Sequence, residues 1–321
     1  MVVESLGFSL DGEGAHLWLQ IEKTGLNTRD LITALVAGLK IAEKDIGYSG
    51  LKDKQAVTCQ WFSVPWPIAM ALPEMAEMPL PEGAHVRKLI RSGKKLRRGT
   101  HRTNEFTVTL RELTTDHDVI ERRLHTVASV GFPNYFGVQR FGSDGRNVDN
   151  ARSMFVRRRK LSRFKRSIYL SAARSYLFNQ VLAARVENGS WLQVLPGEVC
   201  MLAGSNSVFK CDMPDTDIQK RHDEHDIHTT GPMVGSGDAM TTRDVHELES
   251  RFMQEEDLLC SGLKAAGLKS ERRALRASAI NLQWQWIDEK TLEIAFALQR
   301  GVYATSMLGE IADLQQTEKS L

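Results

Sequence analysis

The sequence predicts an α+β fold, in which strands and amphipathic helices follow one another in an irregular order. Four segments, 15–22, 56–64, 103–113 and 282–298, alternate apolar and polar side chains with the two-residue period of a strand. Segments between them repeat apolar residues every three or four positions, as helices that pack on a sheet do. At 321 residues the chain exceeds the usual size of one domain, so we expect one large domain or two.

The first half of the chain begins with a strand and a helix. Leu17, Leu19 and Ile21 alternate with polar or aromatic neighbours in the strand 15–22. A helix capped by Asn27 or Thr28 follows, and its apolar positions recur every four residues: Leu31, Leu35 and Leu39. Five prolines between positions 65 and 81 predict an irregular surface loop before the strand 103–113.

The second half is predicted to be mainly helical until its last hairpin. We expect helices over 115–130, ending at Gly131, and over 168–186. Between 195 and 237 the pattern indicates only loops and short strands. A capping box at 241–244 predicts a helix whose buried stripe consists of Val245, Leu248, Phe252 and Leu259. A further helix is expected over 270–278, followed by the hairpin 282–298, which returns the chain to the first sheet.

Composition excludes several classes of protein. No apolar run is long enough to span a bilayer, and the acidic start, MVVESLGFSLDGEG, is unlike a signal peptide. The chain has four cysteines, Cys59, Cys200, Cys211 and Cys260, which are far apart and form no C-x-x-C pair. Neither a zinc knuckle nor a disulfide framework is therefore indicated. We therefore expect a cytoplasmic protein in a reducing compartment.

Positive charge is concentrated in two blocks, although the net charge is only +2. No acidic residue lies between Glu82 and Glu105, or within 150–186, where ten basic residues occur. Such dense positive charge favours a polyanionic partner, as expected for a phosphate backbone, over a pair of solvated faces.

The run HDEHDIH at 222–228 contains three histidines, three positions apart. Only neighbouring histidines would share a helical face, and ligand spacing alone is weak evidence for a metal. We therefore interpret this run as a solvated polar loop and predict no metal site there.

The segment 48–64, YSGLKDKQAVTCQWFSV, places one carboxylate, Asp53, in a loop between two runs of strand character. Gly50 allows the backbone to turn with positive φ or to approach a ligand closely. Lys52 and Lys54 bracket the aspartate with positive charge, which favours its ionised form, and an ionised aspartate can act as a nucleophile. Spacing alone is also compatible with an ordinary solvated turn, and favours it.

Four separated motifs resemble those of the TruD family of tRNA pseudouridine synthases. The string GLKDKQAVTCQWFSV resembles the family's central motif G-x-K-D-K-x-A-V-T-x-Q, and GTHRTNEFTVTL resembles its G-x-x-x-x-N-x-F pattern. Two further strings resemble the opening of the family's inserted domain and its C-terminal motif: GFPNYFGVQRFG and GVYATSMLGEI. The resemblance extends over nearly the whole chain.

The resemblance implies a pseudouridine-synthase-type catalytic domain with a mixed, mainly antiparallel sheet flanked by helices. An inserted α/β TRUD domain would interrupt it. We expect residues 1–130 and 278–321 to form the catalytic domain and 131–277 the inserted domain.

The resemblance also implies an isomerase that converts a uridine of tRNA, at position 13, to pseudouridine without a cofactor or metal. Asp53 would be the catalytic nucleophile, and the uridine would be flipped into a pocket. The implied substrate-binding residues are Asn104, Phe106, Tyr303, Lys52 and Gln60. We expect RNA phosphates to contact Arg97, Arg98, Arg140, Arg157, Arg158 and Lys160.

Partners other than tRNA are not implied: we expect no membrane, no obligate protein partner and a monomer. The alternative function is an RNA-binding protein of the same fold that helps tRNA to fold, with weak or no catalysis. Two departures from the family pattern bear on this choice. The sequence begins at MVVE, after the family's upstream lysine and phenylalanine, and Gly309 stands where relatives often have an arginine.

Overall fold

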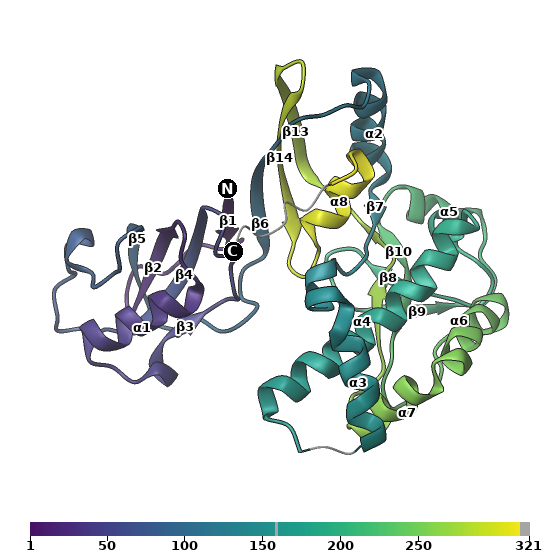
Figure 1. The fold of residues 1–321 in the computed structure, drawn as a ribbon, viewed down its shortest axis with the longest axis horizontal. Helices are drawn as coiled ribbons and strands as arrows, with labels where there is room; N and C mark the ends of the chain where they lie inside the picture. The colour runs from purple at the N-terminus through teal and green to yellow at the C-terminus, as the bar shows by residue number, and fades with distance from the viewer. Residues whose placement is uncertain (158–159, 315–321) are drawn as a thin grey trace. The chain divides into compact units, whose positions relative to one another are not determined.

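The computed structural model describes residues 1–157 and 160–314, and their contacts divide the chain into two compact units. The first consists of Met1–Thr114 and Ala279–Gly301, and the second of Thr115–Ser278 together with the residues that follow from Val302. Figure 1 shows the elements of each unit along the chain. Within the described ranges, no helix is long and apolar enough to cross a membrane.

The first unit is built on one eight-stranded sheet with the order β13-β14-β6-β1-β4-β2-β5, in which β3 also pairs with β4. Only the β1–β4 pair is parallel among the pairings of this sheet in the described part of the chain. The predicted mixed, mainly antiparallel sheet is therefore confirmed. Its strands are β1 (Val2–Ser5), β2 (His16–Lys23), β3 (Gly47–Tyr48), β4 (Thr58–Pro65), β5 (Ala84–Ser92), β6 (Thr103–Leu110), β13 (Ile280–Asp288) and β14 (Thr291–Gln299).

Helix α1 (Thr28–Leu39) packs on the part of this sheet formed by β2 and β4. Asn27 is its N-cap, as expected, and the Asp30 carboxylate accepts the Asn27 N–H at 2.7 Å. Helix α1 and strand β2 each present one apolar face to the other, and these faces bury together. The contacting side chains are Leu31 and Leu35 of α1 and Leu17, Leu19 and Ile21 of β2. The opposite face carries a second cluster around Trp18 and Trp61. Strand β4 is therefore buried on both faces from Thr58 to Val64, not half-buried as its alternation predicts.

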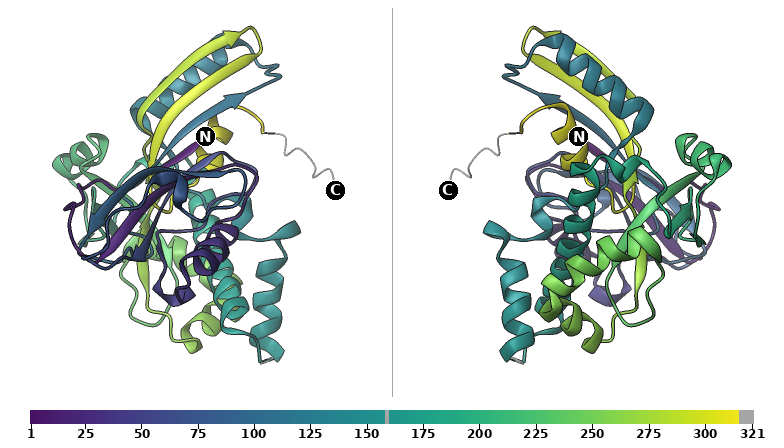
Figure 2. Two further views of the ribbon diagram at one scale, coloured as in Figure 1. Left: turned by 90° about the vertical axis from the view of Figure 1, so that its left-hand side faces the viewer. Right: turned by 90° about the vertical axis from the view of Figure 1, so that its right-hand side faces the viewer.

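The second unit contains a four-stranded sheet with the order β11-β10-β8-β9 and a small sheet that pairs β12 with β7. Its strands are β7 (Phe132–Pro133), β8 (Glu198–Leu202), β9 (Val208–Cys211), β10 (Ile227–Met233), β11 (Glu271–Ala274) and β12 (Arg276–Ala277). Its helices are α2 (His117–Val130), α3 (Arg146–Arg157), α4 (Arg163–Glu187), α5 (Thr216–Asp223), α6 (Arg243–Glu255), α7 (Asp257–Ala265) and α8 (Ala304–Ile311). Helices α3 and α4 lie side by side (Figure 2) and share an apolar core with α7.

Short 3-10 segments connect several of these elements. They are η1 (Glu43–Asp45), η2 (Met75–Glu77), η3 (Val138–Arg140), η4 (Ser143–Gly145) and η5 (Ser190–Leu192). The predicted surface loop at 65–81 thus contains one turn of 3-10 helix.

The helix expected over 270–278 is wrong, because these residues form β11 and β12. Helix-forming residues dominate the segment, yet β11 pairs with β10 in register from Thr230 opposite Ala274 to Met233 opposite Glu271. The Arg272 guanidinium adds hydrogen bonds to the Thr230 carbonyl and to the Glu249 carboxylate. Tertiary pairing therefore outweighs local propensity here.

The helix expected after 241 is divided into α6 and α7, and its capping box does not form. Thr242 is the N-cap, but its hydroxyl donates to Asp212 at 3.0 Å, while the Thr241 hydroxyl donates to Glu249 at 3.1 Å. Helix α4 also begins earlier than expected, at Arg163 after the N-cap Ser162. The basic residues that precede Ile168 therefore lie in the helix itself.

The predicted solvated loop at 222–228 is confirmed only for the turn 224–226, in which Glu224 and Asp226 are exposed. His222 ends up fully buried near the end of α5, and β10 begins at Ile227. Burial, with the Arg276 guanidinium adding to it, lowers the pKa of both His222 and His228 to about 4. Over the described ranges, no group of three or more histidine, cysteine or acidic side chains is arranged to hold a metal ion.

Contacts place the unit boundaries differently from the expected domain boundaries. Helix α2, within the expected catalytic segment 1–130, groups with the second unit, and so does α8 near the C-terminus. Compactness does not tell which unit carries catalysis, so the assignment of 1–130 and 278–321 to a catalytic domain stays a prediction.

Candidate active site

The loop that carries Asp53 leaves the sheet after β3 and returns at the start of β4. These two strands pair antiparallel, with Gly47 opposite Ser63 and Tyr48 opposite Phe62. Gly50 has no positive φ, and a Cβ added there would meet open space, so the backbone turn does not require glycine. Close approach of a ligand, the other reason for glycine at this position, stays a prediction.

Two buried side chains fix the first part of the loop. The Gln60 amide of β4 donates to the Gly50 carbonyl at 2.5 Å. The Thr28 hydroxyl, at the start of α1, accepts the Lys52 main-chain N–H at 2.9 Å and donates to the Gln60 side-chain oxygen at 3.0 Å. Gln60, predicted to bind substrate, therefore holds the main chain of the loop.

The Asp53 main chain is held by a third buried group, the ammonium of Lys23. This lysine is the last residue of β2 and is fully buried, and its Nζ donates to the Asp53 carbonyl at 2.7 Å and to the Leu26 carbonyl at 2.6 Å. Burial lowers the pKa of Lys23, while the Asp53 and Asp30 carboxylates act in the opposite direction.

The Asp53 carboxylate itself is exposed, and its Oδ1 accepts the Gln55 N–H at 3.1 Å. The expectation that Lys52 and Lys54 both bracket Asp53 is wrong for Lys52, because its ammonium binds Glu4 and Asn104. Lys54 is exposed. An exposed carboxylate on an anchored main chain can reach a substrate while its backbone stays in place.

Lys52 instead joins a buried network with Glu4 and Asn104. Its Nζ lies 2.7 Å from the Glu4 Oε1 and donates to the Asn104 Oδ1 at 2.9 Å. The sheet register explains this meeting, because Glu4 of β1 lies directly opposite Asn104 of β6. Burial raises the pKa of Glu4, whereas the Lys52 ammonium and the Trp61 N–H, 2.9 Å from Oε2, favour its ionised form.

The other end of the Asn104 amide faces His101. Asn104 Nδ2 and His101 Nε2 are 3.3 Å apart. Burial, with Lys52 and Arg300 adding to it, lowers the pKa of His101 to about 4, so the ring is neutral at pH 7 and Nε2 can accept this bond. The amide is thereby oriented at both ends, and each end keeps a second hydrogen-bonding position for a ligand.

Phe106 lies two residues beyond Asn104 on β6 and therefore shares its face of the sheet. The half-buried ring stacks on Phe296 of β14, with centroids 5.1 Å apart and planes at 14°. One face of Phe106 is therefore covered by protein. Substrate binding by Phe106 stays a prediction.

Tyr303 belongs to the second unit, whereas Asp53, Lys52, Gln60, Asn104 and Phe106 belong to the first. It is the N-cap of α8, and its hydroxyl accepts a hydrogen bond from Arg140 Nε at 2.8 Å. Arg140 also donates to the Ser171 hydroxyl at 3.1 Å. Arg140, predicted to contact RNA, therefore orients Tyr303 inside the second unit, and its contact with RNA stays a prediction.

Most of the other residues predicted to contact RNA are exposed. Arg97, Arg157 and Lys160 are exposed, and so is Arg98, which donates to the Tyr48 hydroxyl at 2.7 Å. Arg158 lies outside the described residues. Two apolar side chains near Arg157 and Lys160 are also strongly exposed: Val156 at the end of α3 and Phe164 at the start of α4.

Comparison with known proteins identifies the family. The family model described as tRNA pseudouridine synthase D (TruD) matches residues 1–153 and 148–311. The tRNA pseudouridine synthase D of Hydrogenovibrio crunogenus is 38% identical over 315 residues, which cover 98% of this chain and 90% of that protein. The protein of the same name from Xanthomonas campestris pv. campestris is 42% identical over 327 residues, covering 98% and 89%. This chain belongs to the TruD family.

A solved structure shows the same fold. The crystal structure of the putative tRNA pseudouridine synthase D from Methanosarcina mazei aligns with a TM-score of 0.76 at 18% identity, covering 97% of this chain and 90% of that one. The TruD fold predicted from the four motifs is therefore confirmed.

Sequence reasoning missed three residues of the candidate site in this TruD-family chain: Lys23, Glu4 and His101. A signal for Lys23 was present, because it continues the alternation of Leu17, Leu19 and Ile21 and so falls on the buried face of its strand. Glu4 and His101 gave no comparable signal, since their partners come from other strands.

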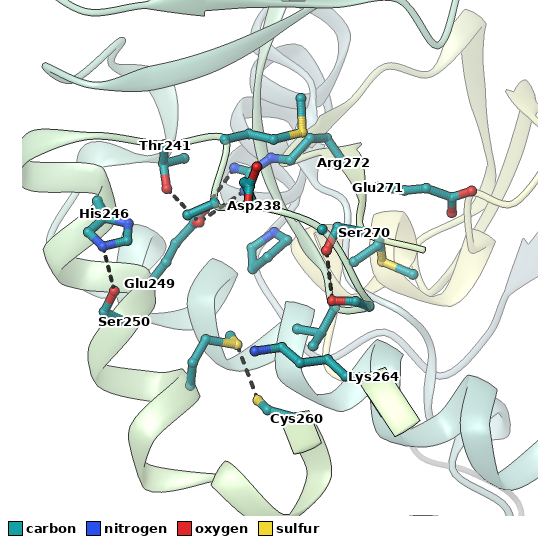
Figure 3. A pocket seen from close by; sticks show the side chains of 18 residues that line it. Asp238, Thr241, His246, Glu249, Ser250, Cys260, Lys264, Ser270, Glu271 and Arg272 are labelled. Atoms are coloured by element: carbon teal, nitrogen blue, oxygen red, sulfur yellow. Dashed lines mark hydrogen bonds and ion pairs between the residues drawn. The ribbon is translucent and has the colours of Figure 1, made fainter. Parts of the chain in front are cut away.

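A pocket of this TruD protein lies entirely within the second unit (Figure 3), and none of the predicted site residues lines it. Its buried polar groups bind one another: Arg272 donates to both Glu249 carboxylate oxygens, at 3.0 and 2.7 Å, and Glu249 also accepts from Thr241. This network supports the packing of α6 against β11.

A thiol nucleophile near the Asp53 loop is disfavoured. Cys59 lies in the strand that follows the loop and is buried, and burial raises the pKa of its thiol to about 11. The neutral thiol is a poor nucleophile at pH 7.

Proposed function

We propose that this chain is a tRNA pseudouridine synthase that converts a uridine of tRNA, at position 13, into pseudouridine, with Asp53 as the nucleophile. Membership of the TruD family supports the reaction. The observation that carries the role of Asp53 is its exposed carboxylate on a loop whose main chain is held by Gln60, Thr28 and Lys23.

The reaction is an isomerisation, so its atoms and electrons balance without an oxidant, a reductant or a group donor. The bond from ribose C1′ to uracil N1 breaks, a bond from C1′ to C5 forms, C5 loses its proton and N1 gains one. Asp53 acts on the ribose or on the base, and both routes require an ionised carboxylate within reach of the nucleotide.

The target uridine has to leave its stack to reach Asp53. In this proposal Asn104 binds the uracil edge through its side-chain amide, and Phe106 stacks on the base. Exposed basic residues, Arg97, Arg98, Arg157 and Lys160, contact phosphates and position the tRNA without reading its sequence. The protein acts as a monomer in the cytoplasm, where its substrate is found.

The decisive experiment incubates the wild type and Asp53→Asn with unmodified tRNA and maps the alkali-resistant carbodiimide adducts that mark pseudouridine. The wild type is expected to modify one uridine, at position 13, and Asp53→Asn to bind tRNA with unchanged affinity but to form no product. A substrate with cytidine at position 13 tests the site. Turnover by Asp53→Asn would remove Asp53 from its role, and binding by the wild type without product would favour an RNA-folding function instead.

A further inference from the structure

Lys23 presents a charge where the fold would otherwise place an apolar side chain. It follows Leu17, Leu19 and Ile21 on one face of β2, and all four residues are fully buried. It pairs with Thr58 of β4 on one side and with Ala84 of β5 on the other. Because Thr58 is the first residue of β4, this register places Lys23 beside the point where the Asp53 loop rejoins the sheet.

A buried ammonium is expensive unless it is hydrogen-bonded, because burial removes its hydration. A methionine of similar length would fill the same space without that cost. The Lys23 ammonium donates hydrogen bonds to two main-chain carbonyls, those of Leu26 and Asp53, at 2.6 and 2.7 Å. The first closes the turn between β2 and α1, and the second reaches across 30 residues to the loop.

We propose that Lys23 is a positioning residue, whose buried ammonium fixes the main chain of Asp53 and thereby the direction of its carboxylate. This inference rests on the proposed role of Asp53. Of the groups that hold the loop, Lys23 alone bonds to the main chain of Asp53 itself among the described contacts; Gln60 and Thr28 hold Gly50 and Lys52.

The test replaces the ammonium by a side chain of similar length, Lys23→Met. A misdirected nucleophile lowers kcat, so we expect kcat for pseudouridine formation to fall about 10- to 100-fold. KM for tRNA should change by less than about threefold, because Lys23 is not among the residues proposed to contact RNA. Lys54→Met is the matched comparison: it removes the same charge from an exposed position of the same loop, and should act on KM more than on kcat.

A second readout is the pH profile of kcat. The charged groups that act on Lys23 are Asp53 and Asp30, which favour the ammonium, and Lys52, which opposes it. In the wild type, deprotonation of Lys23 should weaken its bond to the Asp53 carbonyl, because a neutral amine is a poorer donor than an ammonium, and so add an alkaline decline in kcat. Lys23→Met should lack that component of the decline, an effect that a merely structural role would not produce.

The outcomes separate this inference from the proposed function. An inactive Asp53→Asn together with a Lys23→Met whose kcat and pH profile match the wild type would overturn the positioning role alone. An active Asp53→Asn would overturn the proposed function first. If Lys23→Met does not fold, Lys23→Arg and Lys23→Gln are compared instead. The inference requires Lys23→Arg, which keeps the charge, to have a higher kcat than Lys23→Gln. Equal kcat values for the two variants would refute it.

Discussion

The Lys52 ammonium and the Glu4 carboxylate form a buried ion pair of 2.7 Å at the base of the Asp53 loop. The Glu4 side chain is fully buried, and that of Lys52 is 10% exposed. The pair is joined to Asn104 by a second bond of the same ammonium. Stability of the first unit and orientation of a predicted substrate-binding amide therefore depend on the same charge.

Removing one member of this pair should destabilise the protein strongly. We expect Glu4→Gln to lower the free energy of unfolding by about 3 kcal/mol, because it leaves the Lys52 charge buried without its counter-ion. Urea denaturation measures this change. The double variant Glu4→Leu with Lys52→Met should recover most of the loss yet remain poorly active, and a double variant with wild-type activity would contradict the proposed coupling to Asn104.

Stability should fall at mildly acidic pH because of buried histidines in both units. Burial lowers the pKa of His101, His222 and His228 to about 4, below the value of 6.5 for an exposed histidine. The unfolded chain therefore binds more protons between pH 6.5 and 4, so stability decreases as the pH falls through that range and is fully present above it. Each histidine can account for up to about 3 kcal/mol.

Urea denaturation between pH 7 and pH 5 tests this pH dependence. His222→Leu should reduce its slope by about 1.4 kcal/mol per pH unit, the value for one proton. An unchanged slope would show that His222 binds protons as readily in the folded protein as in the unfolded chain.

Contact with RNA phosphates should be visible as a change in salt dependence. Arg157→Gln removes one exposed charge, so we expect the slope of log affinity against log salt to decrease by roughly 0.7 to 0.9. Phe164, which is 71% exposed and lies four positions after Lys160 in the sequence, should act differently. Phe164→Ala is expected to weaken tRNA binding by about 1–3 kcal/mol without changing the slope, because stacking involves no counter-ion.

The matched control for Phe164 is Met213→Ala. Met213 is 63% exposed in the same unit, but it lies in the sequence between acidic residues, Asp212 and Asp215. Its replacement should leave tRNA affinity unchanged. Equal effects of Phe164→Ala and Met213→Ala would contradict a specific contact of Phe164 with a base.

A steric prediction concerns Gly197, which precedes β8. Its φ is +83°, and a methyl group there would overlap the Thr242 carbonyl at the start of α6. Gly197→Ala should therefore destabilise by more than about 2 kcal/mol. Gly204→Ala is the control, because Gly204 has a similar φ of +71° but open space around it, and about 1 kcal/mol is expected there. Thermal unfolding of both variants makes the comparison.

Much of the fold could be predicted where local pattern and tertiary pairing agree. Trp284 and Trp286 alternate with polar residues, and the predicted hairpin of β13 and β14 is confirmed. Residues 271–274 show the opposite case. Their Glu-Arg-Arg-Ala sequence favours a helix, but pairing with β10 and the bonds of Arg272 to Glu249 decide the outcome.

The candidate site was predictable only as far as local motifs extend. Asp53, Gln60 and Asn104 lie in strings whose spacing can be recognised, but the spacing of Lys52 and Asp53 suggested a contact that the structure replaces with the Glu4 pair. Lys23 and Glu4 reach the loop through sheet register, which a single sequence does not specify. Residues joined by pairing of distant strands are therefore the part that sequence patterns leave open.

The pairing of β6 with the late strand β14 has a consequence for synthesis on the ribosome. Strand β1 lies between β6 and β4, and β6 pairs on its other side with β14. One edge of β6 therefore stays open from the time residue 110 emerges until residues 291–299 are translated, while the whole of 115–278 is being made. During that interval, strand pairing between nascent chains competes with completion of the sheet.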